Sequence, residues 1–465
     1  MKNKRYLIFI ILVWIVLIVP FAGMTFWPTN TTSENTVLAE WPAIKNEDGW
    51  NKDYLSEMGE YFEDHFAFRQ YFVTANAVIR SRTVKSQATE QVVLGTDGWL
   101  YYSGTLDDYQ GRNLLSDREL FNIVHNLSLI QEYVEGQGST FRLTIAPNKN
   151  SLYSGNMPYY YRKGGANNIA MLSSRLLAAG IQYTNLFDAF RSRDEVLYFE
   201  RDSHWNNRGA VLAYNTLMDS IGREHETYLN VPYEIQKVHT GDIDEMLYPL
   251  AAEPEEEYFY DKQQSFSYVN DVTDNMDEWI ETVNPDKQGS ILMFRDSFGE
   301  SLLPFVADEM GKGYFSRLVP YNLTQIEDLH PDYVVIEKVE RNIKDFIEDV
   351  PIMETSQVEA IFAPEAVTDS TIETSKEGSY LLIKGSIDEK YISGDTEITV
   401  SVRNNQTMES RTYKTFYTKT EEGDGNGYQL YIKGSSVHAG QLHINTIVTN
   451  KGQSFIVAGK DIQWN

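Results

Sequence analysis

The sequence predicts an α/β fold, in which a sheet is covered by helices, with one transmembrane helix before it and an all-β sandwich after it. Short apolar runs alternate with helix-like segments between residues 116 and 336, which is typical of a parallel or mixed sheet covered on both faces. A long apolar run without charges stands at the N-terminus. Near the C-terminus, apolar and polar side chains alternate between turn residues, as they do in the strands of a sandwich.

The N-terminal segment has the composition of a membrane anchor. MKNKR carries three basic side chains, and the 22 residues from Tyr6 to Trp27 follow without a charge, enough to cross a bilayer core of about 30 Å. The basic flank predicts a single-pass protein of the cell membrane, with a cytoplasmic N-terminus and an extracellular catalytic domain. A cleaved signal peptide is the alternative, but the run is longer than the usual apolar core of such peptides and no A-x-A site follows it.

Four parts are expected along the chain: the cytoplasmic tip and anchor at 1–27, a polar tether at 28–50, a catalytic domain at 51–365 and a β-sandwich at 366–465. Residues 51–87 have the aromatic spacing of two amphipathic helices. Residues 91–103 predict a hairpin around a Thr-Asp-Gly turn.

The helices and strands of the central sheet follow in order. Ser116 and Glu119 form a capping box that opens a helix ending near Glu135. Further helices are expected at 167–179, 207–221 and 299–310, and strands at 141–145, 181–183, 196–199, 290–294, 314–318 and 333–336. Residues 239–289, which include the acidic run Glu253 to Glu257, are predicted to pass over the surface with that run in solvent.

The tail contains six strand-like runs, at 379–384, 396–403, 411–418, 428–433, 441–449 and 454–464. They predict a sandwich that could bind carbohydrate, although architecture alone does not specify function. Four aromatic residues are candidates for stacking on sugars, with burial as the commoner alternative: Tyr413, Tyr417, Tyr431 and Trp464.

The bulk composition excludes several classes of partner. The 67 acidic residues outnumber the 40 basic ones, and the resulting charge of −27 would repel nucleic acid and disfavour a strongly anionic polymer. A neutral or cationic glycan is therefore the easier substrate. There are no cysteines, which removes disulfides and thiolate chemistry. No His, Asp or Glu spacing predicts a metal site, and no cofactor is expected.

A serine follows one of the expected strands directly. After the run Ile291 to Phe294 come Arg295, Asp296, Ser297, Phe298 and Gly299, and then a helix. A serine at such a turn presents its hydroxyl at the sheet edge, near helix amides that could stabilise an oxyanion. The alternative is an ordinary N-cap serine.

A serine nucleophile needs a base and an acceptor that orients the base. Asp202 and His204 lie two residues apart after the expected strand at 196–199, so extended backbone would place both side chains on one face. Taken alone, the pair is better explained as a surface aspartate and a histidine that forms ordinary hydrogen bonds.

Several motifs in order resemble the SGNH-hydrolase-like proteins of the alginate O-acetyltransferase AlgJ/AlgX type, including those called DHHW. The resemblance covers residues 54–342. It rests on DHFAFR at 64–69, GTDGWLY at 95–101, PNK at 147–149, DSHW at 202–205, GDI at 241–243, DSF at 296–298, and 331–336 leading into Glu340 and Arg341. Ser203 stands where the family name expects histidine, and we expect its side chain to point away from the site.

The resemblance implies a triad of Ser297, His204 and Asp202. It also implies acetyl transfer to an exported polysaccharide, with a membrane-bound O-acyltransferase as the acyl source. A surface carbohydrate esterase and a non-catalytic glycan-binding protein are the alternatives, because the residue types do not distinguish transfer from hydrolysis.

Other residues near these motifs are secondary candidates. The amides of Ser297, Phe298 and Gly299 are expected to form the oxyanion hole. Asn148 and Lys149 follow the strand at 141–145 and could bind acyl or sugar oxygens at the same sheet edge. Trp205 of the DSHW motif is a further candidate for substrate binding. Arg295 is an anion clamp or a surface ion pair, of which we favour the second, and Asp296 is expected to be structural.

Overall fold

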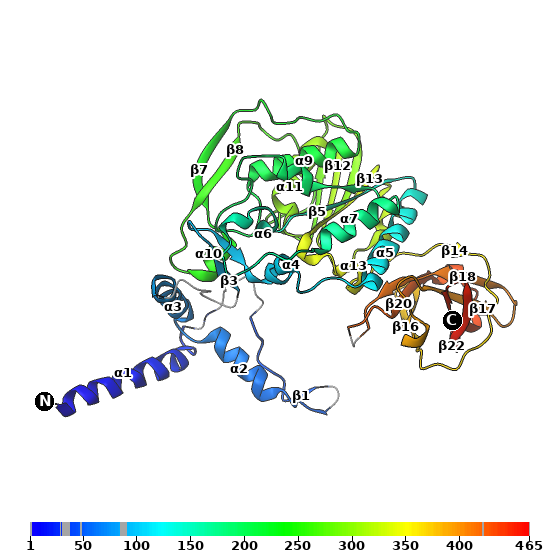
Figure 1. Ribbon diagram of the computed structural model, residues 1–465, viewed down its shortest axis with the longest axis horizontal. Coiled ribbons are helices and arrows are strands. Elements are labelled where there is room, and N and C mark those ends of the chain that lie inside the picture. Colours follow the sequence, from blue (N-terminus) through cyan, green and yellow to red (C-terminus); the bar gives the residue numbers. More distant parts are fainter. Residues whose placement is uncertain are drawn as a thin grey trace.

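The computed structural model describes residues 2–27, 29, 38–46, 49–83, 91–420 and 423–464. Helix α1 (Lys2–Gly23) extends away from the rest of the chain (Figure 1). Its 18 residues Tyr6–Gly23 are long and apolar enough to cross a membrane. The prediction of one apolar N-terminal helix is confirmed, and its length and composition fit both an anchor and a signal peptide.

The segment after α1 contains the expected helices and hairpin. The helices are α2 (Tyr54–His65) and α3 (Arg69–Thr83), and the hairpin pairs β3 (Val92–Leu94) with β4 (Leu100–Tyr102). A short pair, β1 (Lys45–Asn46) and β2 (Gly49–Trp50), lies before α2. Residues 28, 30–37, 47 and 48 of the predicted tether and residues 84–87 of the predicted helical segment lie outside the described residues.

The central sheet has seven strands in the order β6-β5-β13-β11-β12-β10-β9. They are β5 (Thr140–Ala146), β6 (Tyr183–Thr184), β9 (Ser267–Tyr268), β10 (Trp279–Val283), β11 (Ser290–Phe294), β12 (Lys312–Ser316) and β13 (Tyr333–Val339). The strands from β6 to β12 are parallel, whereas β10 and β9 extend the edge antiparallel. The predicted mixed sheet is confirmed.

Helices cover both faces of this sheet because the strand side chains alternate between two cores. On β11, Leu292 and Phe294 enter the core shared with α5 (Asp117–Gly136) and α7 (Asn168–Ala178), whereas Ile291 and Met293 enter the core shared with α9 (Asn207–Ser220) and α11 (Gly299–Glu309). Both predicted partners of the capping box bond as expected at the start of α5. The shorter helices are α4 (Leu106–Gln110), α6 (Lys149–Leu152), α8 (Leu186–Arg191), α10 (Asp242–Leu247), α12 (Ile326–Leu329) and α13 (Asp345–Glu348).

Two predictions about elements near the site are wrong. Residues 196–199 are not a strand, because only Tyr198 forms an isolated bridge, with Trp205. Residues 239–289 are not merely a surface excursion, since they supply β9, β10 and the second strand of a ribbon made by β7 (Tyr233–His239) and β8 (Glu255–Tyr260). Periodicity could not reveal these pairings, which depend on contacts between distant residues.

The tail forms the predicted sandwich. One sheet has the order β14-β18-β17-β21-β22 and the other β15-β16-β20-β19. The strands are β14 (Gln357–Val358), β15 (Glu373–Glu377), β16 (Tyr380–Ser386), β17 (Glu397–Asn404), β18 (Ser410–Lys414), β19 (Phe416–Thr418), β20 (Gly427–Lys433), β21 (Gly440–Asn450) and β22 (Gln453–Trp464). The four candidate sugar-stacking rings are buried: Tyr413, Tyr417, Tyr431 and Trp464. The boundary at 365/366 stays a prediction, and β14, which precedes it, already pairs with β18.

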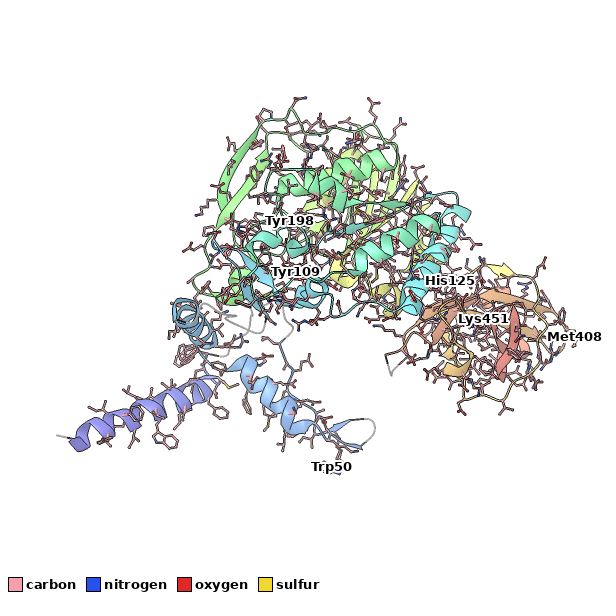
Figure 2. The ribbon with its side chains drawn as sticks, in the orientation of Figure 1. Trp50, Tyr109, His125, Tyr198, Met408 and Lys451 are labelled. Carbon is pink, nitrogen blue, oxygen red and sulfur yellow. The ribbon has the colours of Figure 1, made fainter. Side chains whose placement is uncertain are left out.

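Helix α5 fixes the sandwich to the catalytic part. His125, labelled at this junction in Figure 2, stacks on Tyr417 with 3.9 Å between ring centroids. The side-chain Nδ2 of Asn126 donates to the carbonyls of Phe346 and Tyr417, and its Oδ1 accepts from the main-chain amide of Tyr417. These buried polar contacts make the junction specific as well as close.

Candidate active site

Ser297 lies in the turn between β11 and α11, at the carboxyl edge of the parallel strands. Asp296 holds this turn, because its Oδ1 accepts from the Phe298 amide at 3.0 Å and its Oδ2 accepts from the Val339 amide at 2.7 Å. The second bond ties the turn to the end of the neighbouring strand β13. Asp296 therefore has the structural position that its adjacency to Ser297 suggests.

His204 bridges Ser297 and Asp202. Its Nε2 lies 2.9 Å from Ser297 Oγ, and its Nδ1 lies 2.7 Å from Asp202 Oδ1. A neutral imidazole with its proton on Nδ1 donates to the carboxylate and leaves the Nε2 lone pair facing the serine hydroxyl. The structure thus brings together the three residues that the sequence singled out, from segments almost a hundred residues apart.

The pair forms through a turn, not through the extended backbone that we expected. Asp202 Oδ1 also accepts from the main-chain amide of His204 at 2.8 Å, which folds the chain back on itself. This local bond brings the two side chains together although residues 196–199 form no strand.

Asp202 is the centre of a larger hydrogen-bond network. Its Oδ2 accepts from His239 Nε2 at 2.8 Å and from the Asp242 amide at 3.0 Å, so the carboxylate accepts four bonds in all. Burial alone would raise the pKa of Asp202, but His204 and His239 outweigh burial and hold that pKa well below its usual range. Asp202 therefore remains a carboxylate although it is buried.

Two histidines share this one carboxylate. Burial lowers the pKa of His204, but the charge and hydrogen bond of Asp202 exceed that effect and raise the pKa above its ordinary value. The pKa of His239 is raised against burial by its bond to the same carboxylate. The His239 ring stacks on Phe199, with 3.7 Å between centroids and 8° between the planes.

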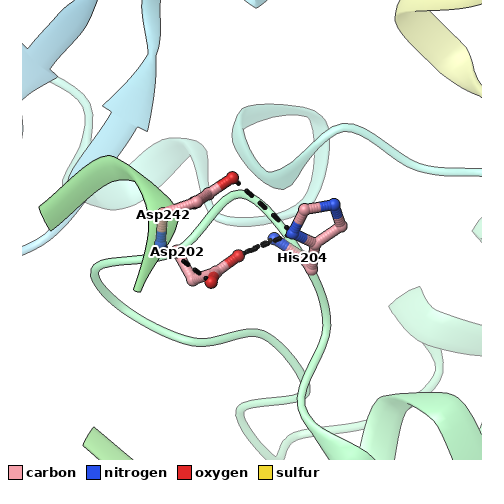
Figure 3. Close-up of side chains that lie close together, drawn as sticks. All are labelled: Asp202, His204 and Asp242. Carbon is pink, nitrogen blue, oxygen red and sulfur yellow. Dashed lines mark hydrogen bonds and ion pairs between the residues drawn. The ribbon is translucent and has the colours of Figure 1, made fainter. Parts of the chain in front are cut away.

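Asp242, which Figure 3 shows beside Asp202 and His204, and Ser203 complete the network. Asp242 Oδ2 lies 3.7 Å from His204 Nδ1 and accepts from Ser203 Oγ at 2.6 Å. The expectation that Ser203 points away is wrong, because its Oγ also lies 3.3 Å from His204 Nδ1. The side chain turns inward because the Asp242 carboxylate binds both its hydroxyl and its amide.

His239 was not predicted as a site residue from the sequence, and Asp242 appeared there only as part of a motif. His239 ends β7, and Asp242 opens α10 just after it. The one signal was the GDI motif at 241–243, which marks the loop but gives no role. A single histidine some 35 positions from the DSHW motif offers no spacing from which contact could be inferred.

Asp202, His204 and Asp242 also bring potential metal-ligand atoms within 4.8 Å of one another. Both oxygens of each carboxylate already accept hydrogen bonds from the protein. A metal ion would compete with the bond between His204 Nδ1 and Asp202, and it would require His204 Nδ1 without its proton. The donor set therefore fits a proton relay better than a metal centre.

A cavity of about 550 Å³ opens beside Ser297 and His204. Besides Asp202, four carboxylates line it: Asp242, Glu245, Glu257 and Glu300. No lysine or arginine lines it within the described part of the chain. The prediction that residues 253–257 lie in solvent is wrong for Glu257. This side chain is buried, and burial raises its pKa. The cavity is consequently acidic.

Two of the three main-chain amides that were predicted to form the oxyanion hole already donate hydrogen bonds within the turn. The Phe298 amide donates to the side chain of Asp296 and the Gly299 amide to its carbonyl. The expectation for these two amides is therefore wrong in this conformation. The Ser297 amide is the remaining one of the three, and within the described residues no acceptor is assigned to it.

The other secondary candidates lie around the cavity without facing it, Trp205 excepted. Asn148 is fully buried and its amide group bonds Asp108, while Lys149 Nζ donates to the carbonyls of Phe199, Glu200 and Asp202. Neither is among the cavity-lining residues of the described chain. Lys149 instead supports the loop that carries Asp202.

Trp205 and Arg295 are packing residues in this structure. Trp205 borders the cavity, but its ring is only 1% exposed and its Nε1 donates to Ser301 Oγ at 2.7 Å. Arg295 is 2% exposed and donates to the carbonyls of Asn275 and Asp277. The expected surface ion pair of Arg295 is therefore wrong, because the side chain is directed under the 275–277 loop.

Comparison with known proteins agrees with the sequence resemblance. Residues 92–283 match the family model described as SGNH hydrolase-like domain, acetyltransferase AlgX, a segment that includes Asp202 and His204 and ends before Ser297. The predicted resemblance and the SGNH-like fold are confirmed. A search of curated proteins found no match.

A search of solved structures matched, among others, three bacterial proteins. Bacillus cereus PatB1 with a sulfonyl adduct is 15% identical over 55% of this chain and 95% of its own, with a TM-score of 0.44. A DHHW family protein from Eubacterium siraeum is 15% identical over 55% of this chain and 92% of its own, with a TM-score of 0.41. The O-acetyltransferase domain of Pseudomonas putida AlgJ is 17% identical over 54% and 91%, with a TM-score of 0.37.

Proposed function

We propose that this chain, which carries an SGNH hydrolase-like domain of the acetyltransferase AlgX type, moves an acetyl group through an acyl-serine onto an exported or cell-surface polysaccharide. One observation carries the proposal. Ser297 Oγ lies 2.9 Å from His204 Nε2, while the opposite ring nitrogen bonds the buried carboxylate of Asp202 at 2.7 Å. This is the arrangement that activates a serine hydroxyl for acyl transfer.

The first half of the reaction forms the acyl-serine. Ser297 Oγ attacks the acetyl carbonyl of the donor as its proton passes to His204 Nε2, and Asp202 stabilises the imidazolium that results. The donor's leaving oxygen takes that proton as its bond to the acetyl carbon breaks. The Ser297 amide, which is not committed within the turn, would donate to the oxyanion, a contribution of about 3 kcal/mol.

The second half releases the acetyl group to the acceptor. A glycan hydroxyl gives its proton to His204 Nε2 and attacks the acetyl-serine, and the proton then returns to Ser297 Oγ as the ester bond breaks. Water in place of the glycan would give an esterase with the same residues. Exclusion of water and binding of the acceptor in the cavity therefore determine the outcome.

The acidic cavity supports a neutral or cationic sugar as acceptor. A uronate entering it would meet Glu245, Glu257 and Glu300 without a lysine or arginine among the lining residues, and carboxylates of like charge repel one another. The net charge of −27 acts in the same direction at longer range. We therefore propose that an alginate-like polyanion is a poor acceptor.

The apolar helix α1 supports a location at the cell membrane, with the N-terminus in the cytoplasm and the catalytic domain outside. A membrane-bound O-acyltransferase would then be the source of the acyl group, because acetyl donors made in the cytoplasm must be carried across the bilayer. Co-purification of the full chain with such a protein from cross-linked membranes tests this part. Recovery of the chain without any integral membrane acyltransferase would contradict it.

Labelling with an arylsulfonyl fluoride tests the nucleophile. We expect one adduct on Ser297 by peptide mass spectrometry, none in Ser297→Ala, and an unchanged adduct in Ser301→Ala, which alters the neighbouring cavity serine bonded to Trp205. A folded wild-type sample without an adduct would contradict the enzymatic proposal.

Acceptor choice is tested with p-nitrophenyl acetate as donor. Neutral, amine-bearing and uronate oligosaccharides are offered in parallel, and acetylated products are separated from free acetate. Free acetate alone would identify an esterase. Preferred acetylation of the uronate oligomer would contradict the proposed acceptor class while leaving the nucleophile intact.

A further inference from the structure

Aromatic side chains at the start of helix α3 stay largely exposed within the described chain, although the Phe72 ring lies 6.1 Å from that of Phe66. Phe68, directly before α3, and Tyr71 and Phe72 in its first turn are exposed by 44%, 66% and 41%. The Phe68 and Tyr71 rings lie 6.3 Å apart on one side of the helix. Ala75 continues this side and is also exposed, whereas Ala67 and Ala77 face the protein and are buried. An apolar stripe on a helix normally faces a core, so this one requires another apolar surface.

The stripe continues into the residues that directly follow α1. The Trp27 and Phe68 rings lie 6.4 Å apart and those of Phe26 and Trp27 lie 5.9 Å apart. Phe26 and Trp27 are 75% and 66% exposed. Phe26, Trp27, Phe68, Tyr71 and Phe72 are called the aromatic patch below.

The elbow between α2 and α3 is held against α1 by direct contacts. The Ala67 amide donates to the Pro20 carbonyl at 3.0 Å, and a β-carbon on Gly23 would lie only 2.8 Å from the Ala67 β-carbon. The Phe21 and Phe62 rings are 4.9 Å apart. The aromatic patch is therefore fixed at one height along α1, just past the apolar window Tyr6–Gly23.

We propose that the aromatic patch lies in the outer interface of the membrane that α1 crosses, so that α3 rests on the bilayer. Eighteen helical residues span about 27 Å, close to the thickness of a bilayer core, and the patch follows directly. Aromatic rings concentrate at this depth because one part of each ring is apolar and the interface is partly wet. Continuity with the exposed apolar surface of α1 favours lipid over a protein partner.

This placement fixes the candidate active site relative to the membrane. Ala77 of α3 packs in one small core with Ile243 and Leu247 of α10, and Thr74 Oγ1 accepts from the Leu250 amide at 3.3 Å. Asp242, the first residue of α10, lies 3.7 Å from His204 Nδ1. One helix therefore connects the bilayer surface with the hydrogen-bond network of Asp202. The inference rests on the proposed membrane location and orientation of α1, and it does not depend on the acetyltransferase proposal.

The natural absence of cysteine permits a direct test in the full chain. Single cysteines are introduced as Tyr71→Cys and Ala75→Cys on the stripe, Asn76→Cys on the flank of the same helix, and Met408→Cys on the sandwich, where the side chain is 65% exposed and far from α1 (Figure 2). Each is labelled with nitrobenzoxadiazole in phosphatidylcholine nanodiscs. Quenching by lipids spin-labelled near the headgroup is compared with quenching by aqueous iodide.

We expect severalfold stronger lipid quenching at positions 71 and 75 than at position 408, an intermediate value at 76, and the reverse order with iodide. Iodide quenching at 71 and 75 equal to that at 408 would place the stripe in water and overturn the proposal. Protection at 71 and 75 from both quenchers would indicate that protein covers the stripe and would also overturn it. Unchanged thermal unfolding of each variant ensures that the labels report on the folded chain.

Discussion

Replacing His239 by alanine removes one of the four hydrogen bonds that Asp202 accepts, while leaving Ser297 and His204 in place. A hydrogen bond to a charged group contributes about 1.5–3 kcal/mol. If the transition state loses all of it, serine acylation slows roughly 10- to 100-fold. The loss follows because Asp202, freed on one side, holds the His204 imidazole less firmly toward Ser297.

The pH profile of His239→Ala separates a positioning role from simple packing. His204 accepts a proton only when neutral, and its raised pKa places the acid limb of the rate profile above the ordinary histidine value of about 6.5. A protonated His239 on the opposite oxygen of Asp202 opposes a second positive charge on His204. Removing His239 therefore raises the pKa of His204 further, so the acid limb moves to higher pH.

The assay is the acylation rate with p-nitrophenyl acetate between about pH 5 and 9, with His239→Gln as the matched control. Glutamine can donate to Asp202 without carrying charge, so we expect it to recover most of the rate and still show the shifted acid limb. A His239→Ala rate within twofold of wild type, with an unmoved acid limb, would refute the reasoning. A lower thermal stability with an unmoved limb would assign His239 a packing role, through its stack on Phe199.

Three further predictions concern stability. Burial lowers the pKa of Lys149 to about 8. Between about pH 8 and 10.5 the unfolded chain therefore binds more protons than the folded chain, so this group makes the free energy of unfolding rise with pH. Urea unfolding should show a smaller rise of that free energy in Lys149→Met, and an identical slope would contradict this. In Gly209→Ala the new β-carbon would clash with the Leu197 carbonyl, costing about 1–3 kcal/mol and lowering Tm, whereas Gly136→Ala, which meets nothing within 4 Å, should not destabilise. Asn126→Ala leaves three buried backbone groups unsatisfied at about 1–3 kcal/mol each. We expect the sandwich to unfold at a lower urea concentration and to be cleaved faster by protease than in the wild type. Equal protease resistance of the two proteins would indicate that water replaces the side chain.

The fold was predictable from local pattern wherever a segment buries its own face. The capping box at Ser116 and Glu119, the strand at 290–294 and the long strands of the tail all appear as expected, because propensity, periodicity and turn residues agree there. The failures lie at 196–199 and 239–289. Leu197 and Tyr198 are buried because they pack in one core with Trp205, and not because they pair in a sheet. Periodicity does not distinguish these two kinds of burial.

The residues of the candidate site likewise differ in whether local sequence could predict them. Ser297 could be found because a strand, a tight turn and a helix place it, all within a few residues of sequence. His239 could not, because its relation to Asp202 depends on the β7–β8 ribbon and on Phe199, which fix the ring by stacking. Asn148 and Lys149 show the opposite error: they were predicted to bind acyl or sugar oxygens at the sheet edge, yet the Asn148 side chain bonds Asp108 and Lys149 bonds main-chain carbonyls beside the cavity. The favoured surface ion pair of Arg295 is replaced by bonds to the carbonyls of Asn275 and Asp277.

These supporting residues explain how a loop without regular structure positions the catalytic pair. The segment from Phe199 to Asp202 has three carbonyls bonded to Lys149, and the amides of Glu200 and Arg201 bond Glu255. Each of these partners comes from a different element, α6 and β8, and satisfies backbone groups that a strand would have paired. The loop is thus fixed by hydrogen bonds from two sides, and the Asp202 carboxylate that it carries accepts from both His204 and His239.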